Sequence, residues 1–137
     1  MLELAAREAD IVGLNPKMAS GAIDASIGPD ATAAATEQKL SWVRRAAGPR
    51  YEALEIQARV HLVVVTDDRE GVVSSLAGMF GLTPDEAMNS PHALCGTVEQ
   101  IADDLVARRE QFGISAYGVP IDALDAFAPV VAKLAGS

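Results

Sequence analysis

The sequence has few of the residues on which disulfide-rich, metal-binding or nucleic-acid-binding proteins depend. Its one cysteine, Cys95, excludes an internal disulfide and a cysteine metal cluster, which favours a reducing compartment. We therefore expect Cys95 to be a small buried hydrophobic residue rather than a nucleophile. Basic residues are also scarce, with 11 Lys and Arg against 19 Asp and Glu, and the net charge of −8 argues against a nucleic-acid partner.

Long apolar runs and metal-ligand patterns are missing as well. No stretch approaches the roughly 20 apolar residues that a membrane-spanning helix needs. The first residues, Met1 to Glu3, do not begin like a signal peptide. The two histidines, His61 and His92, fall on an expected strand and in an expected loop without ligand spacing, so no metal site is predicted. These observations predict a cytoplasmic protein with no membrane partner.

The 137 residues, half of them hydrophobic, suffice for one small domain with a core, and we predict a single α/β unit over residues 1–137. The stretch Leu4–Pro16 shows the pattern on which this prediction rests. Apolar residues at helical spacing lead to a short apolar run, Ile11–Leu14, which Asn15 and Pro16 end. A continuous run of this length is typical of a buried parallel strand.

The carboxyl ends of parallel strands are where α/β proteins bind their ligands. We therefore expect the end of this strand, Gly13, Leu14 and Asn15, to contact a ligand. Asn15 is the residue that we would choose first, although its role in ending the strand explains it almost as well.

The rest of the chain alternates helical and strand patterns. Helices are expected from Thr32 to Gly48, from a start at Thr66–Asp68 to about Phe80, from Pro84 to Asn89, from Val98 to Phe112, and from Asp122 to Gly136 with a new start at Pro129. Strands are expected at Leu54–Thr66 and Ile114–Val119. Because helices of ten or more residues separate the three strands, these strands should be parallel.

Two stretches leave alternatives open. The residues between Lys17 and Asp30 form a loop longer than a usual strand-to-helix connection, which is typical of a functional or a disordered segment. In Leu54–Thr66 one face is apolar, whereas the other mixes Gln57, Arg59 and His61 with valines. Such a mixed face can line a barrel interior or face solvent. For His61 alone, a structural or solvated role is favoured over catalysis.

Three parallel strands would leave two unpaired sheet edges and one uncovered sheet face, so the chain is expected to be part of a larger assembly. Several runs also resemble the C-terminal part of luciferase-like monooxygenases: LELAAREADIVGLNP, EQKLSWVRRAAGPRYEALEIQ, VVVTDDRE, FGLTPDEAMNSPHALCGTVEQIADDLVARREQFGIS and AFAPVVAKLAG. Within that superfamily the chain is similar to the deazaflavin-dependent oxidoreductase branch, and the segment SPHALCGTVEQIADDL is the most specific part of the resemblance.

The resemblance implies a partial (β/α)8 TIM barrel, because family members are such barrels of about twice this length and these strands would be their last three. It also implies a deazaflavin (coenzyme F-420) or FMN as cofactor, with Gly13, Leu14 and Asn15 among its contacts. Family members perform hydride transfer or flavin-dependent oxygenation on small molecules. Because the family's glycine-rich phosphate-binding turn and first strands have no counterpart in this sequence, no catalytic residue is assigned.

Three readings follow from the resemblance. In the first, the chain is the C-terminal part of a flavin- or deazaflavin-dependent oxidoreductase or monooxygenase, inactive alone and completed as a homo-oligomer or by a complementing N-terminal half. In the second, it is a non-catalytic half-barrel, an interaction or structural module that self-associates. In the third, it is a truncated product. The sequence leaves the substrate unidentified.

Overall fold

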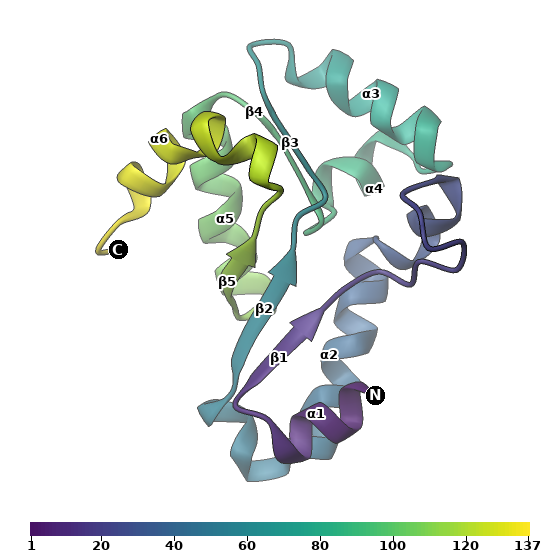
Figure 1. Ribbon diagram of the computed structural model, residues 1–137, viewed down its shortest axis with the longest axis vertical. Coiled ribbons are helices and arrows are strands. Elements are labelled where there is room, and N and C mark those ends of the chain that lie inside the picture. Colours follow the sequence, from purple (N-terminus) through teal and green to yellow (C-terminus); the bar gives the residue numbers. More distant parts are fainter.

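Three parallel strands form the central sheet of the computed structural model, which describes residues 1–137 (Figure 1). They are β1 (Ile11–Leu14), β2 (Glu55–Arg59) and β5 (Ile114–Gly118), in the order β1-β2-β5. β2 therefore pairs on both sides, whereas β1 and β5 each have one free edge. The parallel pairing confirms the direction that the alternating helices and strands predict.

A second, two-stranded sheet continues from the first. It consists of β3 (Leu62–Val65) and β4 (Ala93–Gly96), which also pair in parallel. β3 follows β2 after two residues, so the two sheets share one length of extended chain, as Figure 1 shows.

Helices surround these strands. The α-helices are α1 (Leu2–Glu8), α2 (Ala33–Ala47), α3 (Arg69–Phe80), α4 (Pro84–Asn89), α5 (Val98–Phe112) and α6 (Leu124–Leu134). Three short 3₁₀ helices are η1 (Ala25–Asp30), η2 (Gly48–Ala53) and η3 (Ile121–Ala123). None of these helices has both the length and the apolar character required to span a bilayer.

The main core lies between one face of the central sheet and helices α1, α2 and α5. Its buried members are Ala6, Val12, Leu14, Leu40, Val43, Ile56, Ala58, Phe112 and Ile114. Smaller cores join α5 and α6 to β4, and α3 and α4 to β4. Cys95 belongs to the last of these and burial raises the pKa of its thiol, which confirms that it is a small buried residue.

The opposite face of the central sheet is exposed and carries polar residues on β2, whereas β1 presents Ile11 and Gly13 there. Side chains alternate along a strand, so Val12, Leu14, Ile56 and Ala58 point into the core while Gly13 and Gln57 lie on the other face. This arrangement is that of one wall of a barrel, with helices outside and polar residues on the side that faces a barrel interior.

The prediction of one long strand at Leu54–Thr66 is wrong. The structure divides it into β2 and β3, because pairing changes at Val60 and His61: the Val60 amide donates to the Gly118 carbonyl, whereas the His61 amide donates to the His92 carbonyl. The extended chain thus leaves one partner strand and joins another.

The structure differs from the sequence-based pattern at three other places. β4 was not expected, because its residues, ALCG, lack the β-branched side chains that mark strands. In the loop between Lys17 and Asp30, the last six residues form η1. The last helix begins at Leu124 and runs through Pro129 without a restart.

Substituting Leu40→Ala should lower the free energy of unfolding by roughly 2–5 kcal/mol, because Leu40 is fully buried in the main core and its loss leaves a cavity. Urea unfolding followed by circular dichroism measures the change. Leu4→Ala is the matched control, since Leu4 is 55% exposed and its truncation should have little effect. Equal losses in the two variants would contradict this description of the core.

Candidate functional site

The carboxyl ends of β1, β2 and β5 meet at one edge of the central sheet. Leu14 lies opposite Ala58, and Arg59 lies opposite Gly118, so the three strands end at nearly the same level. Asn15 follows β1 directly. The parallel register therefore brings together residues that lie more than 40 positions apart in the sequence.

A hollow of about 250 Å³ lies at this edge. It is lined by Gly13, Asn15, Gln57, Ala58, Arg59 and Gly118. Two of the three predicted site residues, Gly13 and Asn15, thus border a common hollow. The third, Leu14, has a fully buried side chain in the main core, so that side chain faces away from the hollow.

Arg59 is a candidate site residue that the sequence reasoning did not choose. It is exposed at the end of β2 and makes no ion pair with any carboxylate. A guanidinium in this setting can bind a phosphate or a carboxylate through paired hydrogen bonds. The signal was available, because the alternating pattern placed Arg59 on the polar face beside Gln57, but the position of the strand end was not known.

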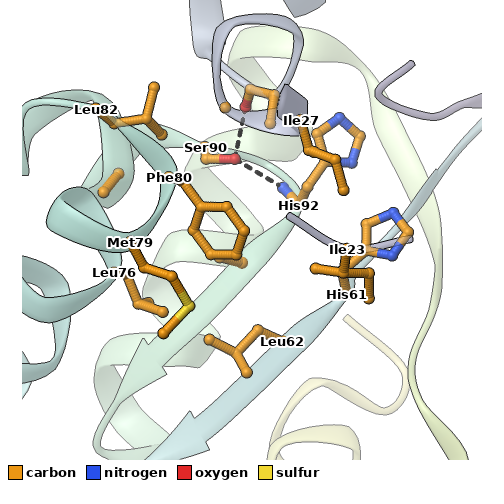
Figure 2. Close-up of a pocket in the computed structure, with 14 residues that line it drawn as sticks. Ile23, Ile27, His61, Leu62, Leu76, Met79, Phe80, Leu82, Ser90 and His92 are labelled. Carbon is orange, nitrogen blue, oxygen red and sulfur yellow. Dashed lines mark hydrogen bonds between the residues drawn. The ribbon is translucent and has the colours of Figure 1, made fainter. Parts of the chain in front are cut away.

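Two further hollows lie next to the first. Arg59 also lines a second hollow of about 380 Å³, whose other walls include His61, Pro120 and Asp122. His61 in turn lines a third, largely apolar cavity of about 250 Å³, which Figure 2 shows. Because each neighbouring pair shares a residue, the three spaces form a row along the strand ends and the start of β3.

His61 and His92 lie close together in the structure, with ring centroids 6.3 Å apart, although they are 31 positions apart in the sequence. Their spacing in the sequence does not reveal this proximity, because the number of residues between two segments says nothing about their distance in the fold. Burial lowers the pKa of His61, and the charge of Arg59 lowers it further.

The tautomer of His92 follows from its surroundings. Its Nδ1 lies 2.9 Å from the carbonyl oxygen of Arg59, which can only accept, so Nδ1 donates. Burial lowers the pKa of His92 to about 4, so the ring is neutral at neutral pH. Nε2 is then an acceptor, and it has no hydrogen-bond partner.

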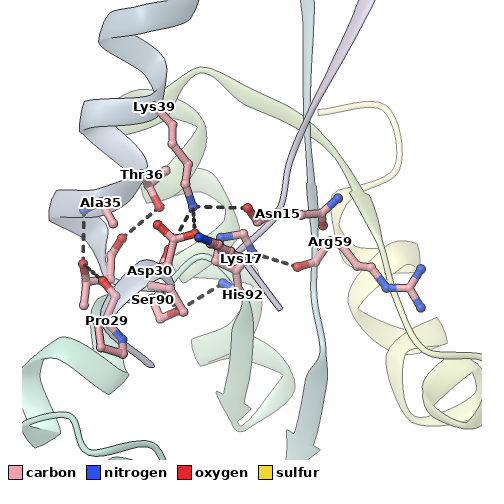
Figure 3. Close-up of polar contacts among 12 residues, drawn as sticks. Asn15, Lys17, Pro29, Asp30, Ala35, Thr36, Lys39, Arg59, Ser90 and His92 are labelled. Atoms are coloured by element: carbon pink, nitrogen blue, oxygen red, sulfur yellow. Dashed lines mark hydrogen bonds and ion pairs between the residues drawn. The ribbon is translucent and has the colours of Figure 1, made fainter. Parts of the chain in front are cut away.

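A buried lysine fastens the loop after β1 to the strand end. Lys39, on α2, is only 7% exposed, and its Nζ donates to the carbonyl oxygen of Asn15 at 3.2 Å (Figure 3). It also donates to the carbonyl oxygen of Asp30 at 2.9 Å and to its Oδ2 at 2.7 Å. The backbone amide of Lys17 donates to the same carboxylate at 2.6 Å.

These contacts join the two ends of the loop, Asn15 and Lys17 at its start and Asp30 at its end, through one ammonium group. Burial by itself raises the pKa of Asp30, but the hydrogen bonds from Lys39 and from the Lys17 amide outweigh it and leave the pKa below its usual value. The carboxylate is therefore charged at neutral pH, and the loop is held against the candidate site.

The structure offers no cluster of three or more histidine, cysteine, aspartate or glutamate side chains placed to bind a metal ion. The chemistry available at the strand ends is instead that of amide, guanidinium and imidazole groups. These groups suit an organic ligand with hydrogen-bonding atoms and an acidic substituent.

Comparison with known proteins reveals similarity at the level of the fold. No family model and no curated protein matches the sequence. The solved structures that resemble the chain include the long-chain alkane monooxygenase LadA (TM-score 0.57, 14% identity, 97% of this chain), the monooxygenase RslO1 from Streptomyces bottropensis (0.50, 22%, 88%) and an F420-dependent secondary alcohol dehydrogenase (0.54, 14%, 97%).

This likeness is one of fold, and it confirms the α/β unit with parallel strands and surrounding helices that the sequence predicts. The chain spans 38%, 37% and 45% of the lengths of these three neighbours. A mixed α/β unit with parallel strands and free sheet edges therefore corresponds to part of a barrel.

The free energy of unfolding should fall as the pH drops from about 6.5 to about 4, because the unfolded chain protonates His92 in this range and the folded chain does not. The His92 contribution is on the order of 3 kcal/mol. Urea unfolding at pH 7.5 and 4.5 measures it. In His92→Asn the pH dependence should shrink, because the amide can still donate to Arg59 but has no basic nitrogen.

His61→Asn is the control for that experiment. The His61 ring is less buried than that of His92, so this variant should keep most of the wild-type pH dependence. A His92→Asn protein with the full wild-type dependence would show that another group is responsible.

Substituting Lys39→Met should loosen the loop between Lys17 and Asp30, because the substitution removes three donated hydrogen bonds and leaves the Asp30 carboxylate without its cation. We expect faster amide exchange across these residues and a loss of roughly 1–3 kcal/mol in the free energy of unfolding. Lys17→Met is the matched control, since Lys17 contacts Asp30 through its backbone amide. Unchanged exchange in Lys39→Met would contradict the role of this contact.

Proposed function

We propose that this chain is the C-terminal part of a cytosolic flavin- or deazaflavin-dependent oxidoreductase and supplies one side of its cofactor site. The observation that supports this most directly is the polar hollow at the strand ends, bordered by Asn15 and Arg59. It lies in a fold shared with two monooxygenases and an F420-dependent alcohol dehydrogenase. In parallel α/β folds this edge is the one at which cofactors bind.

The lining residues fit the chemical groups of such a cofactor. Flavins and deazaflavins combine a planar ring bearing carbonyl and nitrogen atoms with a phosphorylated side chain. Arg59 can bind the phosphate or another acidic substituent, and the side-chain amides of Asn15 and Gln57 can hydrogen-bond the polar edge of the ring. Gly13 leaves room for close approach, since a Cβ at this position would meet no atom within 4 Å.

When bound, the cofactor would supply the redox chemistry itself. The residues of this chain would orient it, Arg59 through charge and Asn15 through hydrogen bonds. The Lys39 contact to the Asn15 carbonyl would fix the backbone from which the Asn15 side chain projects. We assign no catalytic residue among them.

The same proposal includes a partner. The chain spans less than half of each structural neighbour, and both outer strands of the central sheet have free edges. Unpaired edges and an exposed sheet face favour completion by further strands. We propose that a second copy or a complementing polypeptide provides them, and that turnover of a small-molecule substrate requires this assembly.

A second candidate function is a non-catalytic half-barrel that self-associates through its sheet edges. The free edges of β1 and β5 favour it as much as they favour the first, because both functions require a partner for those edges. The two differ in the role of the hollow. Only the first gives Arg59 and Asn15 a ligand.

Isothermal titration of the purified chain with FMN and with coenzyme F-420 tests the proposal. We expect saturable binding of one of them, and Arg59→Gln should weaken it at least tenfold, because a hydrogen-bonded charge contributes about 1.5–3 kcal/mol. Arg45→Gln is the control: it removes the same charge from an exposed position on α2. The two variants have equal net charge, so a general electrostatic effect would weaken cofactor binding equally in both.

Absence of binding by the folded wild-type chain, measured alone and after self-association, would favour the structural module. Equal affinities in Arg59→Gln and wild type would remove Arg59 from the site. Either result leaves the description of the fold intact.

A further inference from the structure

The largely apolar cavity lies outside the proposed cofactor hollow, since its walls include neither Asn15 nor Arg59. It is bordered by η1, by the C-terminal half of α3 and by the first residues of β3 and β4 (Figure 2). Its walls are mainly aliphatic and aromatic side chains, among them Ile27, Leu62 and Phe80. At about 250 Å³ it exceeds the roughly 150 Å³ cavity that is known to bind benzene in another protein, so a molecule with one benzene-sized ring fits.

The polar residues in the wall offer a ligand no hydrogen bond. Ser90 is buried, and its hydroxyl already donates to the Ala31 carbonyl at 2.6 Å and accepts from the His92 amide at 3.2 Å. The Nε2 atoms of His61 and His92 have no partner, but neither has surface that a ligand can reach. The wall contains no Asp, Glu, Lys or Arg. A charged or strongly polar ligand would therefore lose its water without compensation, and the cavity selects against it.

Contacts around the cavity hold its walls in place. Gly28 of η1 packs so closely against the end of α3 that a Cβ at this position would overlap the carbonyl oxygen of Phe80. The hydrogen bond from Ser90 joins the segment before β4 to Ala31, which follows η1. Because η1 is fixed to both of its neighbours, the cavity does not close by collapse of its walls. Small-molecule sites are usually preformed in this way.

We propose that this cavity is a binding site for a small, uncharged, apolar molecule, such as an aromatic ring with one small substituent or a compact hydrocarbon of similar size. The hydrophobic effect drives the binding, because the ligand and the walls both lose contact with water and no polar group is stranded. This site goes beyond the proposed oxidoreductase function, since it occupies a separate space and does not require the cofactor.

The test uses the whole chain without cofactor and two probes that differ by one hydroxyl, fluorobenzene and 4-fluorophenol, followed by ¹⁹F NMR at pH 7. Fluorobenzene should bind saturably. 4-Fluorophenol should bind about fivefold more weakly, because its hydroxyl loses water and finds no partner in the cavity. Since no flavin is present, this titration and the cofactor titration can fail separately.

The four methionines locate the bound probe without any substitution. Only Met79 lines the cavity, whereas Met1, Met18 and Met88 do not and serve as internal controls. In protein labelled with ¹³C at the methionine methyl groups, bound fluorobenzene should show a nuclear Overhauser effect to Met79 and none to Met1.

Two substitutions provide a second measure of the position. Ala93→Leu adds bulk to the cavity wall and should reduce the affinity for fluorobenzene at least tenfold. Ala107→Leu makes an equal change on the exposed side of α5 and should leave the affinity unchanged. Circular dichroism checks that each variant is folded, and the methionine experiment decides the position if Ala93→Leu is not.

Three results would overturn the inference. The first is no saturable binding of fluorobenzene by the folded wild-type chain. The second is saturable binding without an effect at Met79, or with undiminished affinity in a folded Ala93→Leu protein. The third is binding of 4-fluorophenol as tight as that of fluorobenzene or tighter, which would show that a polar group in the wall is within reach.

Discussion

The pairing of β2 with a strand on each side is the constraint on which the rest of this structure depends. Parallel pairing fixes the register of β1 and β5, and therefore places their carboxyl ends at one edge. Alternation along β2 then sends Ile56 and Ala58 to the helices and Gln57 and Arg59 to the open face. Burial of the first pair and exposure of the second are two results of one backbone geometry.

The candidate site depends on a second, local constraint. Lys39 donates hydrogen bonds to the Asn15 carbonyl and the Asp30 carboxylate. If the loop between these residues moved away from the strand end, the buried ammonium group of Lys39 would lose these partners, which is costly. The same loop provides Ile27 to the wall of the apolar cavity. The same loop therefore links the two spaces, because it starts at Asn15, which borders the strand-end hollow, and provides Ile27 to the cavity.

The sequence predicted the helices well because their ends are marked locally. Thr97 and Gln100 form the capping box expected from their spacing, and Gly81 and Gly113 adopt the left-handed conformation that ends a helix. Strand partners are not marked in this way. The division of Leu54–Thr66 and the existence of β4 depend on which distant segment donates or accepts each backbone hydrogen bond, and no residue type encodes that choice.

The sequence by itself determined the α/β class, the parallel direction of the strands and the exposed positions of Gly13 and Asn15 at a strand end, since these follow from periodicity and from the order of elements. Only the tertiary structure decided that Arg59 joins them and that His92 lies beside His61. The physical reason is the distance along the sequence over which each signal acts. Periodicity reports the face on which a side chain lies, whereas proximity between segments is set by sheet register and by packing across the core.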